Sequence, residues 1–244
     1  MASTQSVAEA RIDLAAALRW AERLGLSEGI CNHFSLMVPG RDDRFLINPQ
    51  GLQWAEMTAS ALLLLDADGA VVEGEREPEP TALFIHWRLH AGAPRARCVL
   101  HTHMPYATAL TAIEGGRLEP VHQSALMFHD RVAYDDAYNG LALDDTEGDR
   151  MCAALGNRQV LFLANHGVIV TGDSLAQAFD RLYYLERACT IQVLAMSTGR
   201  PLRRIEDEVA RTTARQIEAD DAQSRVHLTA LKRILDREAP EYRT

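Results

Sequence analysis

Two apolar runs in this chain each stop at histidine, and no other feature constrains the fold as much. The run 98–100 leads into His101-Thr102-His103, and the run 159–163 leads into Ala164-Asn165-His166-Gly167. Short apolar runs bounded by polar residues are typical of buried strands. Because side chains alternate across a strand, His101 and His103 are expected on one face. Three neutral imidazoles converging from two strand ends suit a divalent ion such as zinc, with open positions for substrate.

Each of these signals is weak when it is taken alone. A single His-x-His pair arises often by chance, and a lone histidine at a strand end is more often a hydrogen-bonded structural residue than a ligand. Here two separate runs end alike, and Pro105 or Gly167 follows closely. The sequence therefore predicts a metal-dependent enzyme of small polar molecules, with His101, His103 and His166 as metal ligands.

Composition excludes several broad classes of function. The 244 residues, 47% of them hydrophobic, are enough to bury a large core. A net charge of −9, with Lys232 as the single lysine, argues against nucleic-acid binding, which needs a basic surface. The N-terminal residues lack the pattern of a signal peptide, and no apolar segment reaches the ~18 residues that a membrane span requires. Scattered cysteines without a C-x-x-C motif predict free thiols in a reducing cytoplasm: Cys31, Cys98, Cys152 and Cys189.

The spacing of apolar residues predicts alternating helices and strands. Short turns join several of the strand pairs, which favours a mostly antiparallel sheet flanked by helices. No linker or repeat divides the chain, so we expect one α/β domain over 1–244. A charged helical tail from about 205 is expected as a surface element or a subunit contact. Helices are predicted over 7–24, 81–91, from 105, 149–155, 174–197 and 206–236, and strands over 34–38, 44–47, 62–66, 70–72, 98–103, 132–134, 159–166 and 168–170.

Taken together, the motifs resemble the class II aldolase/adducin family. The resemblance covers about 7–199 and rests on the order Asn32-His33-Phe34-Ser35, Asn48-Pro49-Gln50-Gly51, His86, His101-Thr102-His103 and Asn165-His166-Gly167. It implies an α/β/α sandwich, usually assembled as a C4 tetramer with active sites near subunit interfaces. In members related to fuculose-phosphate aldolase, three histidines hold zinc and a glutamate acts as acid and base.

Carried over by position, the resemblance assigns His101, His103 and His166 to the metal. Asn32 and Gly51 fall in loops that hold a phosphate in the aldolases, and Thr81 stands where those enzymes have a serine. The acid/base glutamate is replaced by Ala82, four residues before His86. Glu79, three residues earlier, could take its place only with a shifted helix start. Adducin and the aldolase-like oxygenases of aminocoumarin pathways share this loss, and the match to these branches is closer.

Proton transfer therefore needs another group. The candidates are His33, His86, His122, His129 and Tyr134. Among them His86 is best placed, one helical turn from Ala82, and His33 lies beside Asn32. The alternative for each histidine is a packed, hydrogen-bonded structural role. His90 and His227 are expected at the surface.

Three functions remain open from the sequence. The first is a metal-dependent lyase, performing aldol cleavage or decarboxylation of a small 2-oxo or 2-hydroxy acid or sugar acid. The second is a non-haem iron oxygenase that decarboxylates an aryl-pyruvate-type acid. Its aryl pocket could be formed by Met104, Leu126, Met127 and Phe128, although such apolar residues are more often part of the core. The third is an adducin-like assembly module without catalysis. The expected cofactor is one divalent transition metal: zinc first, with iron, manganese or cobalt also possible.

Overall fold

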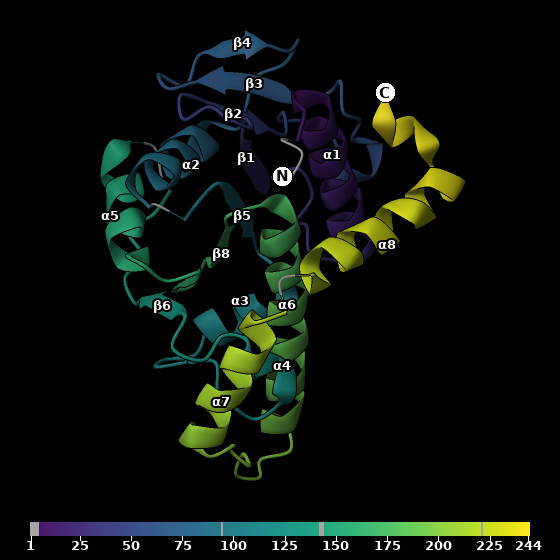
Figure 1. Ribbon diagram of the computed structural model, residues 1–244. Coiled ribbons are helices and arrows are strands. Elements are labelled where there is room, and N and C mark those ends of the chain that lie inside the picture. Colours follow the sequence, from purple (N-terminus) through teal and green to yellow (C-terminus); the bar gives the residue numbers. More distant parts are fainter. Residues whose placement is uncertain (1–4, 94, 142–143, 221) are drawn as a thin grey trace.

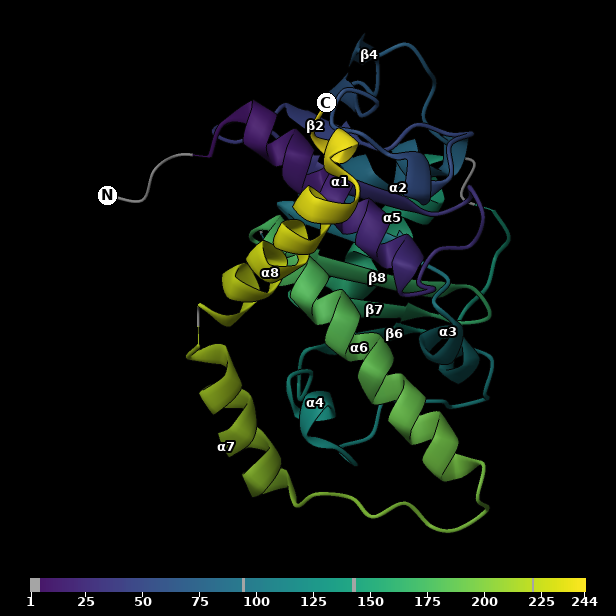
Figure 2. The ribbon, with the colours of Figure 1, turned by 90° about the vertical axis from the view of Figure 1, so that its right-hand side faces the viewer.

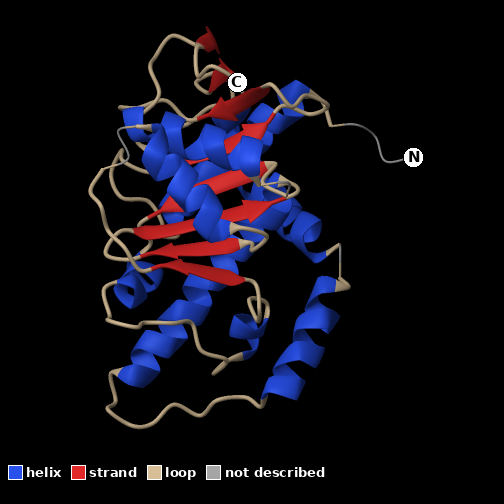
Figure 3. Ribbon diagram, turned by 90° about the vertical axis from the view of Figure 1, so that its left-hand side faces the viewer, coloured by secondary structure: helices blue, strands red, loops and turns tan. Residues whose placement is uncertain are grey.

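The computed structural model describes residues 5–93, 95–141, 144–220 and 222–244 (Figure 1). Its centre is an eight-stranded sheet with the strand order β4-β3-β2-β1-β5-β8-β7-β6 (Figure 3). The pair β6–β7 is parallel, and the other neighbours are antiparallel. The strands are β1 (His33–Met37), β2 (Arg44–Ile47), β3 (Leu63–Asp66), β4 (Val71–Glu73), β5 (Cys98–Thr102), β6 (Val132–Asp135), β7 (Val160–Leu163) and β8 (Gly167–Gly172).

Helices cover both faces of this sheet. The helices α2 (Pro80–Gly92) and α5 (Asp145–Leu155) lie on one face, where Val99 of β5 belongs to their apolar cluster. The helices α1 (Val7–Arg23), α3 (Pro105–Thr111) and α6 (Leu175–Met196) share the other cluster, which includes Leu100. Neighbouring residues of one strand thus enter opposite cores, as the period of two requires. The expected single α/β domain with a mostly antiparallel sheet between helices is confirmed in its architecture.

Helix boundaries follow capping chemistry closely. Ser6 accepts a hydrogen bond from Glu9 N, and the Glu9 carboxylate accepts from Ser6 N, which completes a capping box at the start of α1. The helix expected over 149–155 begins four residues earlier, because Asp144 accepts from Thr146 N and caps it there. Pro80 occupies the first turn of α2, where its missing N–H costs nothing.

The tail departs from the single helix expected over 206–236. It forms α7 (Asp207–Glu218), α8 (Gln223–Glu238) and the short helix η2 (Pro240–Arg243). In Figure 2, α7 lies next to the short helix α4 (Gln123–Leu126), whereas α8 packs against α1 and α6. Leu228 and Leu235 of α8 are buried, so this part of the tail belongs to the packed domain. The remaining short helix is η1 (Trp54–Glu56).

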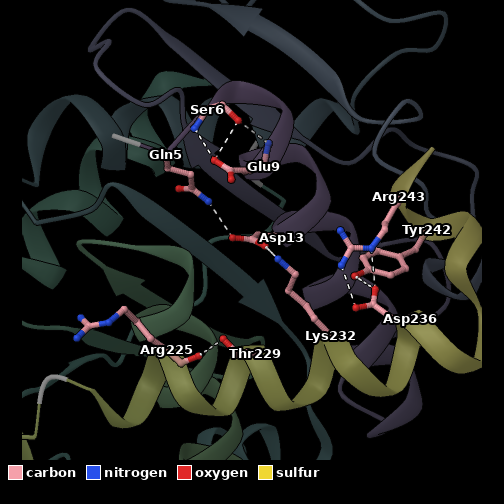
Figure 4. Close-up of polar contacts among 10 residues, drawn as sticks. All are labelled: Gln5, Ser6, Glu9, Asp13, Arg225, Thr229, Lys232, Asp236, Tyr242 and Arg243. Carbon is pink, nitrogen blue, oxygen red and sulfur yellow. Dashed lines mark hydrogen bonds and ion pairs between the residues drawn. The ribbon is translucent and has the colours of Figure 1, made fainter. Parts of the chain in front are cut away.

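Polar contacts fasten the end of the tail to the N-terminal helix (Figure 4). Lys232 of α8 pairs with Asp13 of α1, which also accepts a 2.8 Å hydrogen bond from Gln5 Nε2. Tyr242 is fully buried, and its hydroxyl donates to Asp236 at 2.8 Å. Among the described residues, no helix is long and apolar enough to cross a bilayer.

Candidate metal centre

Three histidines from two parts of the chain meet at one end of the central strands. His101 lies on β5, His103 just after it, and His166 in the turn between β7 and β8. One nitrogen from each residue lies within 4.8 Å of the others, and His101 Nε2 is 3.2 Å from His103 Nε2. His101 is buried and the other two are half-buried. The predicted trio is therefore brought together, at spacings that one cation could bridge.

The sheet register explains this convergence. Thr102 at the end of β5 pairs with Val168 near the start of β8, so the turn before β8 lies beside His103. The strand expected to reach 166 ends at Leu163, and Asn165 takes a left-handed conformation with φ of 55° to close the turn. Gly167 must be glycine, because a Cβ atom there would lie 2.6 Å from Thr102 O.

Hydrogen bonds orient two of the imidazoles. Val168 O can only accept, so His101 Nδ1, at 3.1 Å, carries the hydrogen. The Nδ1 atom of His103 contacts the Glu28 carboxylate in the same way. Both contacts leave the Nε2 atoms facing the shared centre. Hydrogen-bond partners of this kind usually surround the histidine ligands of a metal site.

The protonation state also suits a metal. Burial lowers the pKa of His101 well below its ordinary value. Burial, with the nearby His103, lowers the pKa of His166 to about 4. Both rings are therefore neutral near pH 7, which is the form that binds metal ions. The donor set, its orientation and its charge fit one divalent transition metal.

A cavity of about 390 Å³ opens beside the three histidines. His103, His166 and Thr81 line it, together with Glu28 and Tyr138, two residues that the sequence analysis did not single out. The ring of Tyr138 lies 6.5 Å from that of His166. Glu28 and Tyr138 stand in loops outside any motif, so only the folded arrangement identifies them.

The expected substrate-binding residues behave differently from one another. Thr81 lines the cavity, and its hydroxyl donates to Glu79. Asn32 is buried; its Oδ1 accepts from Glu28 N at 2.9 Å and His103 N at 3.3 Å, while its Nδ2 has no partner among the described residues. Gly51 lies in the turn after β2 and does not line this cavity.

Two of the candidate bases lie against the metal centre. The ring of His33 stacks on that of His101, with centroids 4.9 Å apart, and His33 Nδ1 is 2.7 Å from His86 Nε2. Glu79 caps the start of α2, and its carboxylate lies 3.7 Å from His33 Nε2. Ala82 is fully buried in an apolar cluster with Ile47 and others, so no carboxylate stands at that position.

The other candidate bases are not brought to the centre. Tyr134 packs in the cluster on the opposite face of the sheet, and its hydroxyl accepts from Leu118 N at 3.0 Å. His122 caps α4, and His129 lies 3.1 Å from Asp207 of α7. Strand parity decides the placement of Tyr134, because its neighbours in β6 face the other way.

A further expectation is wrong. His90 and His227, expected at the surface, are half-buried: His90 Nδ1 donates to Ala96 O, and His227 Nδ1 bonds Asp180 at 2.7 Å. For the apolar residues considered either as an aryl pocket or as core, the structure supports the core: Met104, Leu126 and Phe128 are buried, and Met127 packs against the cluster that holds Met104 and Phe128. The cavity beside the histidines takes its apolar wall from Ile85 and Leu141.

Comparison with protein families gives one match over most of the chain. The model of the class II aldolase and adducin N-terminal domain matches residues 12–193. A Pseudomonas aeruginosa protein named after the class 2 aldolases is 37% identical over 242 residues, covering 96% of this chain and 92% of that protein. The decarboxylase NovR of Streptomyces niveus is 33% identical over 206 residues, covering 83% and 75%.

Human beta-adducin is 33% identical over 193 residues, which cover 78% of this chain but only 26% of adducin. Among solved structures, an aldolase II superfamily protein from Pseudomonas syringae superposes with a TM-score of 0.91 at 36% identity, over 100% of this chain and 98% of that one. The similarity thus extends through the tail as well as the sheet.

Proposed function

Because this chain belongs to the class II aldolase and adducin family, we propose that it is a metal-dependent lyase. It cleaves a carbon–carbon bond in a small 2-oxo or 2-hydroxy acid or sugar acid, by aldol cleavage or decarboxylation. The observation that carries this proposal is the convergence of His101, His103 and His166 beside an open cavity. A scaffold without catalysis has no need for three such ligands at an opening of substrate size.

The three histidines would hold one divalent ion. Zinc is the first choice for neutral imidazoles with open positions, and iron, manganese or cobalt fit the same donors. Such an ion, when bound, supplies a Lewis acid that polarises a carbonyl of the substrate. Glu28 supports the set by keeping His103 Nδ1 protonated and its Nε2 free to bind.

Proton transfer falls to His33 in this proposal, with His86 behind it. In aldol cleavage, His33 Nε2 takes the proton of the substrate hydroxyl, the carbon–carbon bond breaks, and its electron pair moves to the 2-oxo group. The same imidazolium then returns the proton to the carbon, so that an aldehyde and a 2-oxo acid leave. In decarboxylation carbon dioxide leaves instead, and the carbon left behind takes up a proton. His33 is suited to this task because its ring lies against His101 and no carboxylate stands at Ala82.

The substrate would be held by groups around the cavity. Thr81 lines the cavity, where its hydroxyl already donates to Glu79. Asn32 Nδ2 has no partner among the described residues but lies outside the cavity lining, so it would serve an acidic substrate that reaches past this wall. Gly51 lies in a different turn, so a role for it requires the substrate to extend beyond this cavity. We further infer from the family a homotetramer in the cytoplasm, and the net charge of −9 argues against nucleic-acid partners.

Two observations favour a second function. The missing carboxylate at Ala82 and the apolar wall of Ile85, Leu141 and Tyr138 suit oxidative decarboxylation of an aryl-pyruvate-type acid by non-haem iron. The decarboxylase relative supports loss of carbon dioxide in either chemistry. The two functions differ in the metal and in the need for dioxygen.

Metal analysis of protein purified without added metal tests the proposal. Zinc, manganese or cobalt with oxygen-independent cleavage of hydroxylated 2-oxo acids supports the lyase, whereas iron with oxygen uptake on aryl-pyruvates supports the second function. The variant His103→Ala should lose metal and turnover while its circular dichroism is unchanged, and His122→Gln, outside the site, is the matched control. Absence of metal from the wild type would leave the assembly module as the remaining function.

A further inference from the structure

We propose that Ser35 and His90 are positioning residues that fix the tautomer of His33, so that its Nε2 atom carries the lone pair that accepts a proton. The inference rests on the proposed function for the use of that lone pair. The tautomer itself follows from hydrogen bonding alone.

A continuous chain of contacts runs from the metal centre to the end of α2. His33 Nδ1 lies 2.7 Å from His86 Nε2, and His86 Nδ1 contacts the Ser35 hydroxyl. Ser35 Oγ lies 2.7 Å from His90 Nε2, and His90 Nδ1 contacts the carbonyl oxygen of Ala96. The two helical histidines are four residues apart, so one face of α2 presents both to the β1 strand.

The contact between His90 and the Ala96 carbonyl determines which atom donates in every other hydrogen bond of the chain. A carbonyl oxygen can only accept, so His90 Nδ1 carries its hydrogen and His90 Nε2 has the lone pair. The single hydroxyl hydrogen of Ser35 must then point to His90, which leaves Ser35 Oγ to accept from His86 Nδ1. His86 Nε2 is consequently an acceptor, and His33 Nδ1 is its donor.

The chain leaves the other nitrogen of His33 without a hydrogen. His33 Nε2 lies 3.7 Å from the Glu79 carboxylate, beyond hydrogen-bond distance, as expected for two acceptors. The Glu79 carboxylate instead accepts from Thr81 and from Ala82 N. Once Nε2 takes a proton, this carboxylate becomes its counter-charge, and Thr81 joins it to the cavity wall.

Burial supports the assumption that each ring carries one hydrogen. His33, His86 and Ser35 are buried, and burial lowers the pKa of His90 to about 4. A protonated ring within the chain would place two donors against each other and leave one unsatisfied, which is costly in a buried site. The neutral arrangement instead pairs every donor of the chain with an acceptor.

Nitrogen-15 NMR of histidine-labelled, zinc-loaded protein measures the tautomer directly. His33→Gln identifies the His33 signals by their loss. In the wild type, we expect the His33 proton on Nδ1. In His90→Leu, the freed Ser35 hydroxyl can donate to His86, and the His33 proton should move to Nε2. His90→Gln is the matched variant, since its amide can still accept from Ser35 and donate to Ala96 O, and it should keep the wild-type tautomer.

A wild-type proton on Nε2, or an unchanged tautomer in His90→Leu, would overturn the inference. Should His90→Leu fail to fold, Ser35→Ala breaks the same chain. Turnover adds a separate reading: His90→Leu should lower kcat about tenfold or more with KM and zinc content unchanged, and His90→Gln should restore it. An altered tautomer with unaltered kcat would refute the positioning role. If the wild type shows no turnover, the proposed function fails, but the NMR measurement still decides whether the His33 tautomer is the one inferred.

Discussion

Removing the charge of Glu28 should weaken metal binding at a site to which Glu28 contributes no ligand. The Glu28 carboxylate contacts His103 Nδ1, and it is the only carboxylate within bonding distance of the three histidines among the described residues. Loss of such an outer partner costs about 10- to 100-fold in metal affinity. The Glu28 side chain is 64% exposed, so solvent screens its charge. We therefore expect the lower end, about tenfold or ~1.4 kcal/mol, for Glu28→Gln.

The size of the effect should depend on what replaces the carboxylate. Gln can still accept from His103 Nδ1 and loses only the charge, whereas Glu28→Ala also loses the acceptor and should fall further, toward about 100-fold. Glu75→Gln is the matched control, because Glu75 is exposed and makes no side-chain hydrogen bond or ion pair among the described residues. Its affinity should equal that of the wild type.

Competition with a fluorescent zinc chelator, at fixed pH and ionic strength, measures all five affinities. The expected order is wild type and Glu75→Gln first, then Glu28→Gln, then Glu28→Ala, with His103→Ala weaker than any of them. Affinities of both Glu28 variants within twofold of the control would refute the reasoning, because His103 would then need no outer partner.

Three further predictions concern stability of the metal-free protein. The free energy of unfolding should fall as the pH drops from about 6.5 to about 4, because burial lowers the folded-state pKa of His90 to about 4 and the unfolded chain takes up the proton first. Urea titrations across this pH range should show a smaller change in unfolding free energy for His90→Gln than for the wild type. Equal changes in the two proteins would contradict this. Ala82→Glu places a carboxylate in an apolar cluster and should cost about 3 kcal/mol, whereas Ala91→Glu, exposed on the same helix, should change the urea midpoint little. Leu235→Ala should cost about 2–5 kcal/mol, because this fully buried residue holds α8 on the domain; a midpoint equal to that of the wild type would show that the tail contributes nothing.

Much of the fold could be predicted from local patterns. Apolar alternation located the strands, and the helix expected over 174–197 agrees within a residue with α6, which Ser174 caps. The errors lie where local signals compete. Asp144 capped α5 earlier than the apolar pattern suggested, and the charged tail concealed the break between its two helices. The apolar residue Leu235 then drew the second of these helices onto the core.

Some residues of the candidate site could be predicted from local patterns and others could not. His101, His103 and His166 could be proposed as ligands because they follow apolar runs closely, and strand geometry carries that spacing into space. Tyr134 was misplaced because no local signal tells which face of a sheet an edge strand presents. Glu28 and Tyr138 were missed because they lie in loops, whose positions depend on what they pack against.

The sequence by itself therefore determined which residues can form strands, where those strands stop, and which imidazoles stand at their ends. Only the tertiary structure decided which other histidine stacks on that centre, which histidines are joined through Ser35, and which carboxylate faces His103. The physical reason is that periodicity and capping act over a few residues. The pairing of β5 with β8, and of α2 with β1, joins segments more than forty residues apart, through contacts that no short stretch encodes.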